Sequence, residues 1–484
     1  MRHPGLKVIG SVIGLVLAGN LAGCADSSAK VPLGTTATSS LETKEHRDNY
    51  GAKKLAMTPG GSSFAGAIVA DEPTAALIAR DVMAKGGNAA DAATALYFAL
   101  SVTYPAAASL GGGGVCLVRD VKNKGEVSTV AFPVTEPKAG GAVGVPGNVR
   151  GFALIQARYG SKRWATLVSP AERMAVIGTQ VSRATAQQLA DNALVIGSSP
   201  DLNQLFVRGD GATYHEADML RQVKLASILG RIRASGVNAF YDGSFANQFV
   251  QQTAAFGGAI TLADLRSYRP VVEPAQSIPA DELEVKLPAT NVAAGRFAAT
   301  LWKDIQGASG ASLVSKADQA AVASGAPQGS SLEGNYGSTS FVVVDGQGGA
   351  VACALSMNGA FGIGHATDGS GVVLASAPDT VIKGRGSQYL VPLMVVRAKA
   401  SDGLYGAGAG AGAPKGAAAL ESSVAAALTG VDGALENALD GSPADEASPV
   451  NIIFCQKGLP RGTCSLHANP KGSGVGLSAV GAGS

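Results

Sequence analysis

The stretch GNYGSTSFVVVDGQGGAVACALSMN, residues 334–358, decides the fold. It contains a Gly/Asn-rich loop, a Val-rich apolar run, a Gly-rich turn and a second apolar run, and this pattern predicts a β-hairpin. If the turn lies in the GQGG segment, Ser338 falls opposite about Met357. A slip of one residue would place it opposite Ser356 or Asn358, which share one face of the second strand. The sequence therefore predicts a hydroxyl at a strand start, beside hydrogen-bonding side chains.

Ser338 could be a nucleophile only if a base activates it, because a serine hydroxyl alone is weakly nucleophilic. The sequence contains no G-x-S-x-G elbow and no Ser/His/Asp set that would supply one. Scission of the peptide bond before Ser338 would free an α-amino group with a pKa near neutrality, which suits a general base. The flexible Gly337 before it is what such a cut requires. The alternative is that Ser338 merely begins an edge strand.

The residues before this hairpin are mainly helical in pattern. Asp71 is expected to cap a helix that begins near Pro73, and Asn88 to cap the Ala-rich helix that follows. The GGGG run at 111–114 is not a phosphate loop, since no Gly-Lys-Ser/Thr follows it, and it is expected to permit close backbone approach. Residues 306–337 read as a low-complexity linker between a helical first part and a strand-rich second part.

Composition restricts the classes of function. The chain has 484 residues, with 38 Lys and Arg against 36 Asp and Glu, so its net charge of +2 gives no reason to expect a nucleic-acid partner. Five scattered His without H-x-H or H-E-x-x-H spacing predict no metal site. We expect no organic cofactor.

The N-terminus has the layout of a secretory signal over residues 1–23, with basic residues, a short apolar run and the ending LAGC at Cys24. That ending resembles a bacterial lipobox, which implies cleavage before Cys24 and lipidation of its thiol. Residues 24–60 are small and polar, as a flexible tether to the membrane would be. We therefore expect a lipid anchor in the cell envelope facing the periplasm, with Ala25 weakly favouring the outer membrane.

Export would also permit disulfides. Cys455 and Cys464 flank a Gly/Pro turn and could close a hairpin disulfide, or could remain free. Cys116 and Cys353 lie in apolar, strand-like runs and are expected to be buried, inert thiols.

Several motifs occur together in one order along the chain. They are GGNAADAATALYFALSVTYPAAASLGGGGVCLV (86–118), VGVPGNVRGFALIQARYG (143–160), GGAITLADLRSY (257–268) and STSFVVVDGQGGAVACALSMNGAFG (338–362). In these the chain resembles the γ-glutamyltranspeptidase (glutathione hydrolase) family of N-terminal-nucleophile hydrolases. The resemblance implies an α/β (α+β) fold, an αββα sandwich with a helical N-terminal part. It also implies a proenzyme that cuts itself into two chains, with 61–305 resembling the large subunit and 338–484 the small one.

The resemblance also implies roles for single residues. Ser338 matches the family's catalytic threonine and Thr339 the threonine that follows it. Ser356 matches a hydroxyl that steadies the nucleophile, and Asn358 an asparagine that binds the amino-acid end of the substrate. Pro133 stands where the family has an arginine that clamps the γ-glutamyl carboxylate, and proline cannot donate the two charged hydrogen bonds of that clamp.

Two functions are compatible with this sequence. In the first, the protein is a γ-glutamyltransferase-like, autoprocessing acyl hydrolase or transferase that acts on γ-glutamyl or other amide bonds. In the second, it is a catalytically degenerate envelope lipoprotein, uncut, with a binding or structural role.

Overall fold

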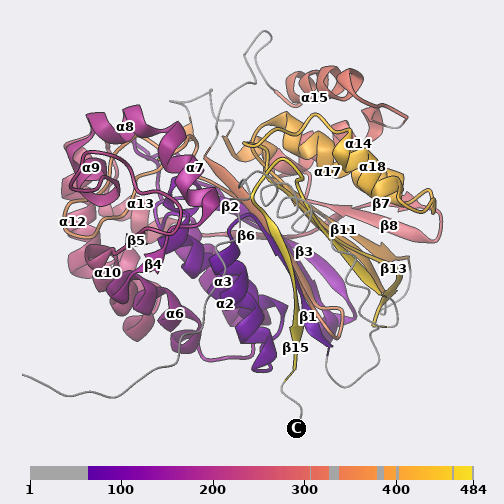
Figure 1. Ribbon diagram of the computed structural model, residues 1–484, viewed down its shortest axis with the longest axis horizontal. Coiled ribbons are helices and arrows are strands. Elements are labelled where there is room, and N and C mark those ends of the chain that lie inside the picture. The colour runs from indigo at the N-terminus through magenta and orange to yellow at the C-terminus, as the bar shows by residue number, and fades with distance from the viewer. Residues whose placement is uncertain are drawn as a thin grey trace, which may run out of the picture. The chain divides into compact units, whose positions relative to one another are not determined.

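The computed structural model describes residues 64–305, 307–325, 337–378, 386–398, 403–460 and 463–481. The expected signal peptide (1–23), the lipidation site Cys24 and the tether (24–60) lie outside these residues. Figure 1 shows two twisted β-sheets lying against each other with helices on their outer faces.

The first sheet has seven antiparallel strands in the order β15-β1-β9-β10-β2-β3-β6. The predicted hairpin supplies its two central strands, which is why the hairpin's apolar runs are buried on both faces. The strands are β1 (Phe64–Ala70), β2 (Gly113–Asp120), β3 (Glu126–Phe132), β6 (Val271–Pro274), β9 (Ser338–Asp345), β10 (Ala350–Ser356) and β15 (Val475–Val480).

The second sheet has six antiparallel strands in the order β14-β13-β12-β11-β8-β7. They are β7 (Gln276–Ala280), β8 (Leu283–Leu287), β11 (Val391–Arg397), β12 (Leu404–Gly410), β13 (Val450–Leu459) and β14 (Cys464–Ala468). The two sheets share one apolar cluster, in which Val342 and Ala352 of the first sheet pack with Ala407 and Ile453 of the second. Alternate residues of each strand fill this cluster, as face-to-face sheet packing requires.

Helices cover the outer face of each sheet. On the first sheet Phe341 and Cys353 pack beneath Phe98 and Phe152, and on the second Leu393 packs with Leu420. The first layer contains α2 (Pro73–Ala84), α3 (Ala89–Thr103) and α5 (Asn148–Tyr159), and the second contains α14 (Ala293–Asp304), α15 (Ala311–Ala323), α17 (Pro414–Ala427) and α18 (Ala434–Asp440). The four layers form the αββα sandwich that the resemblance implied.

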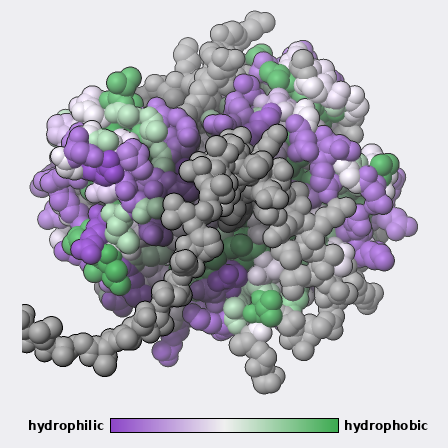
Figure 2. Space-filling view, in the orientation of Figure 1, coloured by the Kyte–Doolittle hydropathy of each residue, from purple (hydrophilic) through white to green (hydrophobic). Residues whose placement is uncertain are grey.

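A further group of helices lies beside α2 and α3 (Figure 1). It contains α4 (Pro105–Ala108), α6 (Trp164–Ile177), α7 (Arg183–Asp191), α8 (Ala193–Ser198), α9 (Pro200–Phe206), α10 (Val223–Ser235), α11 (Asn238–Tyr241), α12 (Gly243–Ala254) and α13 (Leu262–Ser267), with the short strands β4 (Thr179–Gln180) and β5 (Met219–Leu220). Figure 2 shows that hydrophilic residues dominate its visible face, with separate hydrophobic patches near α8 and α10. Among the described helices, none combines the length and apolar character that crossing a bilayer demands.

Two local expectations are corrected by the structure. The N-cap of α2 is Glu72, whose carboxylate accepts a hydrogen bond from the Ala75 N–H (2.7 Å), so Asp71 is not the cap. The expected linker at 306–337 contains α15 in its described part, because Leu313 and Ala317 bury an apolar face in the second helical layer. Asn88 does cap α3, through a reciprocal capping box with Asp91.

The cysteines of the sandwich form two disulfides. Cys455 and Cys464 are joined across the β13–β14 hairpin, with an S–S distance of 2.03 Å. Cys116 and Cys353 are buried as expected, but they are not free thiols. They lie directly opposite each other on β2 and β10 and are also joined. Their runs, 237 residues apart in sequence, lie on neighbouring strands, which the sequence alone did not reveal.

Candidate active site

Ser338 lies directly opposite Ser356, at the end of the central strand pair β9–β10. The two side chains share one face, since directly paired residues of antiparallel strands point the same way. The register is therefore one of the alternatives left open by the sequence. The register differs by one residue from the pairing of Ser338 with Met357. The turn explains this difference: the Asp345 carboxylate accepts hydrogen bonds from the N–H groups of Gln347 and Gly349, and Ala350 pairs with Val344.

The shared face of Ser338 and Ser356 points into the space between the sheets. Ser340, two residues further along β9, donates from its hydroxyl to the Ala409 carbonyl of β12 on the opposite sheet (3.0 Å). Ser338 must point the same way because side chains alternate along a strand. Ser338 is 6% exposed and Ser356 2% exposed, so both hydroxyls lie at a nearly closed end of the sandwich.

The residue before Ser338 has a backbone geometry that only glycine accommodates well. Gly337 has a φ of +53°, and a Cβ placed on it would lie 2.1 Å from the carbonyl oxygen of Gly359. Its own carbonyl oxygen accepts a hydrogen bond from the backbone N–H of Met357 (2.9 Å). The carbonyl of the peptide bond between Gly337 and Ser338 is thus fixed in position and polarised by the Met357 N–H.

Asn358 connects Ser356 to the loop that follows β10. Its backbone N–H donates to the Ser356 hydroxyl oxygen (2.9 Å), and its side-chain amide donates to the Ser376 carbonyl (3.0 Å). Asn358 has a φ of +55° and is 3% exposed. A contact between Asn358 and substrate stays a prediction, but its present bonds orient Ser356.

Thr339 faces the helical layer rather than the space between the sheets. It is fully buried, and its hydroxyl donates to a carboxylate oxygen of Asp71 (2.7 Å). The same oxygen accepts the backbone N–H of Ser340 (2.9 Å), while the other oxygen accepts the side-chain amide of Asn451 (2.8 Å). Burial raises the pKa of Asp71, and these hydrogen bonds act in the opposite direction. A substrate contact by Thr339 stays a prediction.

Sequence reasoning missed two polar residues beside β9, Asp71 and Asn451. Asp71 lies two residues before the start of α2 and is expected from the sequence to cap it, a position that Glu72 occupies instead. Asn451 lies within an apolar strand of the second sheet. The sequence signal at both positions is a polar residue next to an apolar stretch. This pattern is too common in proteins to identify a site.

The row of residues that begins with Ser338 and Ser356 continues across the first sheet. Ser356 pairs with Gly113, and the backbone of Pro133 lies against Gly113, where a Cβ would be 2.5 Å from the Pro133 carbonyl carbon. This confirms the close backbone approach predicted for the glycine run. Three strand spacings, about 14 Å, separate Ser338 from Pro133. The row Ser338–Ser356–Gly113–Pro133 has no charged side chain.

An arginine from another strand or helix could in principle replace the one missing at Pro133, but two candidates, Arg119 and Arg150, are engaged elsewhere. Arg119 pairs with Ala350 at the far end of β2 and donates to the Gly348 carbonyl (2.6 Å). The Arg150 guanidinium donates to the Tyr268 carbonyl and lies 4.2 Å from the centre of the Tyr241 ring. Neither side chain is directed at the row that contains Pro133.

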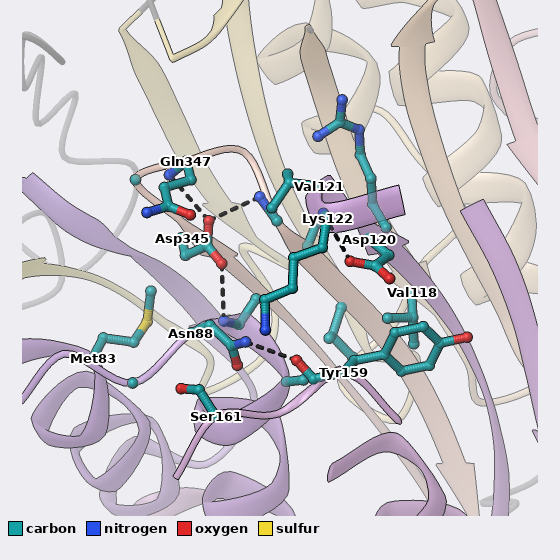
Figure 3. A pocket seen from close by; sticks show the side chains of 18 of the residues that line it. Met83, Asn88, Val118, Asp120, Val121, Lys122, Tyr159, Ser161, Asp345 and Gln347 are labelled. Carbon is teal, nitrogen blue, oxygen red and sulfur yellow. Dashed lines mark hydrogen bonds between the residues drawn. The ribbon is translucent and has the colours of Figure 1, made fainter. Parts of the chain in front are cut away.

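A cavity of about 510 Å³ lies at the opposite end of the strands. Figure 3 shows Asp345 bonded to the start of α3 there, and the Lys122 side chain extending toward Asn88. Asp345 is at the other end of β9, roughly 23 Å from Ser338. The cavity is therefore separate from the candidate active site. Within the described ranges, no three His, Cys, Asp or Glu side chains are grouped to hold a metal ion.

Comparisons with known proteins agree with this architecture. A family model described as Gamma-glutamyltranspeptidase matches residues 75–301. The glutathione hydrolase proenzyme of Bacillus subtilis is 31% identical over 224 residues, 42% of this chain and 38% of that protein. The proenzyme of Escherichia coli is 32% identical over 227 residues, 43% of this chain and 39% of that protein. The chain thus spans less than two fifths of the length of these curated relatives.

The structural likeness extends further than the sequence likeness. The crystal structure of cephalosporin acylase from Bacillus halodurans superposes with a TM-score of 0.66 at 18% identity, covering 92% of this chain and 99% of that one. At this identity the likeness is one of fold, and it covers about twice as much of the chain as the sequence matches do. The sequence match covers residues 75–301, less than half of the chain, so over this part the chain is similar to the γ-glutamyltranspeptidase family, while the superposition shows a likeness of fold.

Proposed function

We propose that the protein is an N-terminal-nucleophile amide hydrolase or acyl transferase that activates itself by cutting between Gly337 and Ser338. One observation carries the proposal: Ser338 begins β9 opposite Ser356, directly after a glycine of positive φ whose carbonyl is hydrogen-bonded to Met357. β9 lies between β1 and β10 in the sheet, so the alternative that Ser338 begins an edge strand is wrong.

The cut uses groups that are already in place. The Ser338 hydroxyl adds to the Gly337 carbonyl carbon, whose oxygen gains negative charge near the Met357 N–H. The C–N bond breaks, the nitrogen takes up the hydroxyl proton, and the Gly337 acyl group is left as an ester on Ser338. Water then hydrolyses this ester, leaving a carboxylate on Gly337 and a free α-amine on Ser338. The second chain runs from Ser338 to Ser484 and contains 147 residues.

The freed amine then serves as the base in the enzymatic reaction. The Ser338 hydroxyl attacks the substrate's amide carbonyl while the α-amine of the same residue takes the proton and passes it to the leaving nitrogen. An acyl ester on Ser338 results, and water or an acceptor amine removes the acyl group. In this proposal Ser356 orients the attacking hydroxyl, which its position opposite Ser338 and its hydrogen bond from the Asn358 N–H support. Neither step requires a metal or an organic cofactor.

The substrate is a small amide or peptide. Glutathione hydrolases are the curated relatives of this chain, which supports a γ-glutamyl compound as one candidate. The uncharged row that ends in Pro133 favours an acyl group that needs no carboxylate clamp. We therefore propose amide hydrolysis as the reaction and leave γ-glutamyl selectivity to the test described in the Discussion.

We further propose export and lipidation at Cys24, which would place the enzyme in the cell envelope facing the periplasm. The LAGC sequence after a short apolar run supports this. Mass spectrometry of the N-terminal peptide should find a diacylglyceryl mass on Cys24. An unmodified peptide that begins at Met1 would refute both export and anchoring.

The test of self-cleavage is a denaturing gel of the purified protein after reduction of its disulfides. Two fragments are expected, one of which begins with S-T-S-F-V on N-terminal sequencing. Ser338→Ala should give one uncut chain, whereas Ser227→Ala, at an exposed helix position, should cut like the wild type. A wild-type protein that stays in one piece would instead support the uncut envelope protein with a binding or structural role.

A further inference from the structure

We propose that Asp71 is a positioning residue that holds the start of β9, and with it Ser338, after the chain is cut. This inference rests on the proposed function, because it concerns how the new N-terminus stays in place. Asp71 belongs to the part of the chain before the cut, while its partners Thr339, Ser340 and Asn451 belong to the part after it.

The Asp71 side chain replaces a strand neighbour. β1 and β9 pair from Gly66 opposite Asp345 to Ala70 opposite Phe341, and the next pair would be Asp71 with Ser340. β1 ends at Ala70, because the chain turns there into α2. The backbone N–H of Ser340 would thus lose its acceptor, and the carboxylate of Asp71 accepts it at 2.9 Å. The ladder is continued by a side chain where the strand itself stops.

Two further donors fix the same carboxylate. The Thr339 hydroxyl donates to one oxygen (2.7 Å) and the Asn451 amide to the other (2.8 Å). The Asn451 nitrogen also lies 2.9 Å from the Ser340 carbonyl oxygen and 2.8 Å from its hydroxyl oxygen. Hydrogen bonds to a charged acceptor are stronger than neutral ones, so the network restrains both residues that follow Ser338.

The restraint matters because cleavage frees the strand end. Before the cut, Gly337 ties Ser338 to the preceding chain, and afterwards this tie is absent. Ser338 then pairs with Ser356 of β10, and Asp71 holds the two residues that follow it, Thr339 and Ser340. A shift of about 1 Å in a reacting group can slow a reaction by about a hundredfold. A buried anchor on the residues after the nucleophile would prevent such a shift.

The experiment compares Asp71→Ala and Asp71→Asn with the wild type, and uses Asp81→Asn as a matched control. Asp81 lies in the same region of the chain, but its side chain is about half exposed and pairs with Arg80. The extent of cleavage is read from a reducing gel, the fraction of active enzyme from titration of the acyl-enzyme, and kcat and KM from hydrolysis of a chromogenic amide.

Asp71→Ala should lower kcat about 10- to 100-fold per titrated site, with KM within about twofold of the wild-type value. Asp71→Asn should recover part of the loss, since its amide oxygen can still accept the Ser340 N–H. Asp81→Asn should match the wild type. If Asp71→Ala does not fold, Asp71→Asn and Thr339→Val decide the question. In each of these variants the fold-decrease in kcat should exceed the fold-change in KM.

The outcomes distinguish this inference from the function on which it rests. A wild-type chain that is never cut would refute the proposed function. A wild type that is cut and active, with unchanged kcat in the Asp71 and Thr339 variants, would overturn only the role of Asp71. A fall in total activity of Asp71→Ala and Asp71→Asn that matches their loss of titratable sites, with kcat per site unchanged, would reduce Asp71 to a folding requirement and also overturn it.

Discussion

The backbone N–H of Met357 donates a hydrogen bond of 2.9 Å to the carbonyl oxygen of Gly337, the residue directly before Ser338. This bond extends the β9–β10 ladder by one step beyond Ser338 and Ser356. The Gly337 carbonyl, which the proposed cleavage would attack, is therefore fixed by a residue that follows directly after Ser356. The proposed processing and the proposed reaction would thus depend on the same strand pair.

Gly337→Ala should block processing. A Cβ at this position would lie 2.1 Å from the Gly359 carbonyl oxygen, and the φ of +53° disfavours any residue with a side chain. The peptide bond would move away from both the Met357 N–H and the Ser338 hydroxyl. A reducing gel should show mostly uncut chain. Gly197→Ala, at a helix position with open space around it, should be cut normally. Normal cleavage of Gly337→Ala would show that the backbone conformation of Gly337 is not needed for processing.

Pro133→Arg should increase activity toward a γ-glutamyl anilide. An arginine there would add a charged donor to an otherwise uncharged row, and a charge-assisted hydrogen bond contributes about 1.5–3 kcal/mol, or at least about tenfold in kcat/KM. The gain should appear mainly in KM. The anilide of an uncharged acyl group serves as the control and should gain nothing. If the wild type already prefers the γ-glutamyl compound and the variant does not improve it, another residue binds the carboxylate.

Glu421→Gln should stabilise the protein at neutral pH. Glu421 is fully buried in α17, and among the described residues neither of its carboxylate oxygens has a hydrogen-bond partner. Burial raises the pKa of Glu421 well above its ordinary value of 4.5. At a pH above about 4.5 Glu421 therefore stays protonated in the folded state but loses its proton in the unfolded state. The free energy of unfolding of the wild type consequently falls as the pH rises.

Thermal unfolding should show this as a pH-dependent difference between the two proteins. At pH 4 the melting temperatures should be similar, because the glutamic acid is neutral in both states. At pH 7.5 Glu421→Gln should melt about 1–3 °C higher. Glu446→Gln, at an exposed position, controls for the loss of one charge. A difference that stays constant with pH would contradict a raised pKa at Glu421.

Loss of the Cys116–Cys353 disulfide should cost more stability than loss of Cys455–Cys464. The first closes a loop of 237 residues and the second a loop of 9. In the chain-entropy account this ratio corresponds to a difference of about 3 kcal/mol in the free energy of unfolding. The comparison needs the uncut Ser338→Ala background, where both loops are intact. Denaturant unfolding of the two double Cys→Ser variants measures it, and equal losses would count against the entropic explanation.

The sequence predicted the hairpin, because its two Val- and Ala-rich runs and its glycine turn are local signals. It did not predict the register, since the shift depends on the Asp345 carboxylate binding the turn's own N–H groups. The layers of the sandwich followed from the family resemblance rather than from residue patterns. Helix α15 was missed because its Ala- and Ser-rich sequence acquires a buried face only against α14 and α17.

The candidate site was predictable where its residues lie close together in sequence. Ser338, Ser356 and Asn358 belong to one hairpin, and their meeting follows from strand pairing alone. Asp71 lies 268 residues before Thr339, and Asn451 lies 111 residues after Ser340. Such contacts depend on which strands become neighbours across two sheets, and a single sequence carries no local signal of that. The same reason explains the missed pairing of Cys116 with Cys353.

The position of Cys116 before the proposed cut, and of Cys353 after it, has a consequence for the mature molecule. Hydrolysis at Gly337 would change the connectivity of the polypeptide without changing the number of molecules. The two pieces would remain a single covalent species, unable to separate on dilution or to exchange partners between copies. Their recovery after denaturation should then be a first-order process, independent of protein concentration, for as long as that bond stays oxidised.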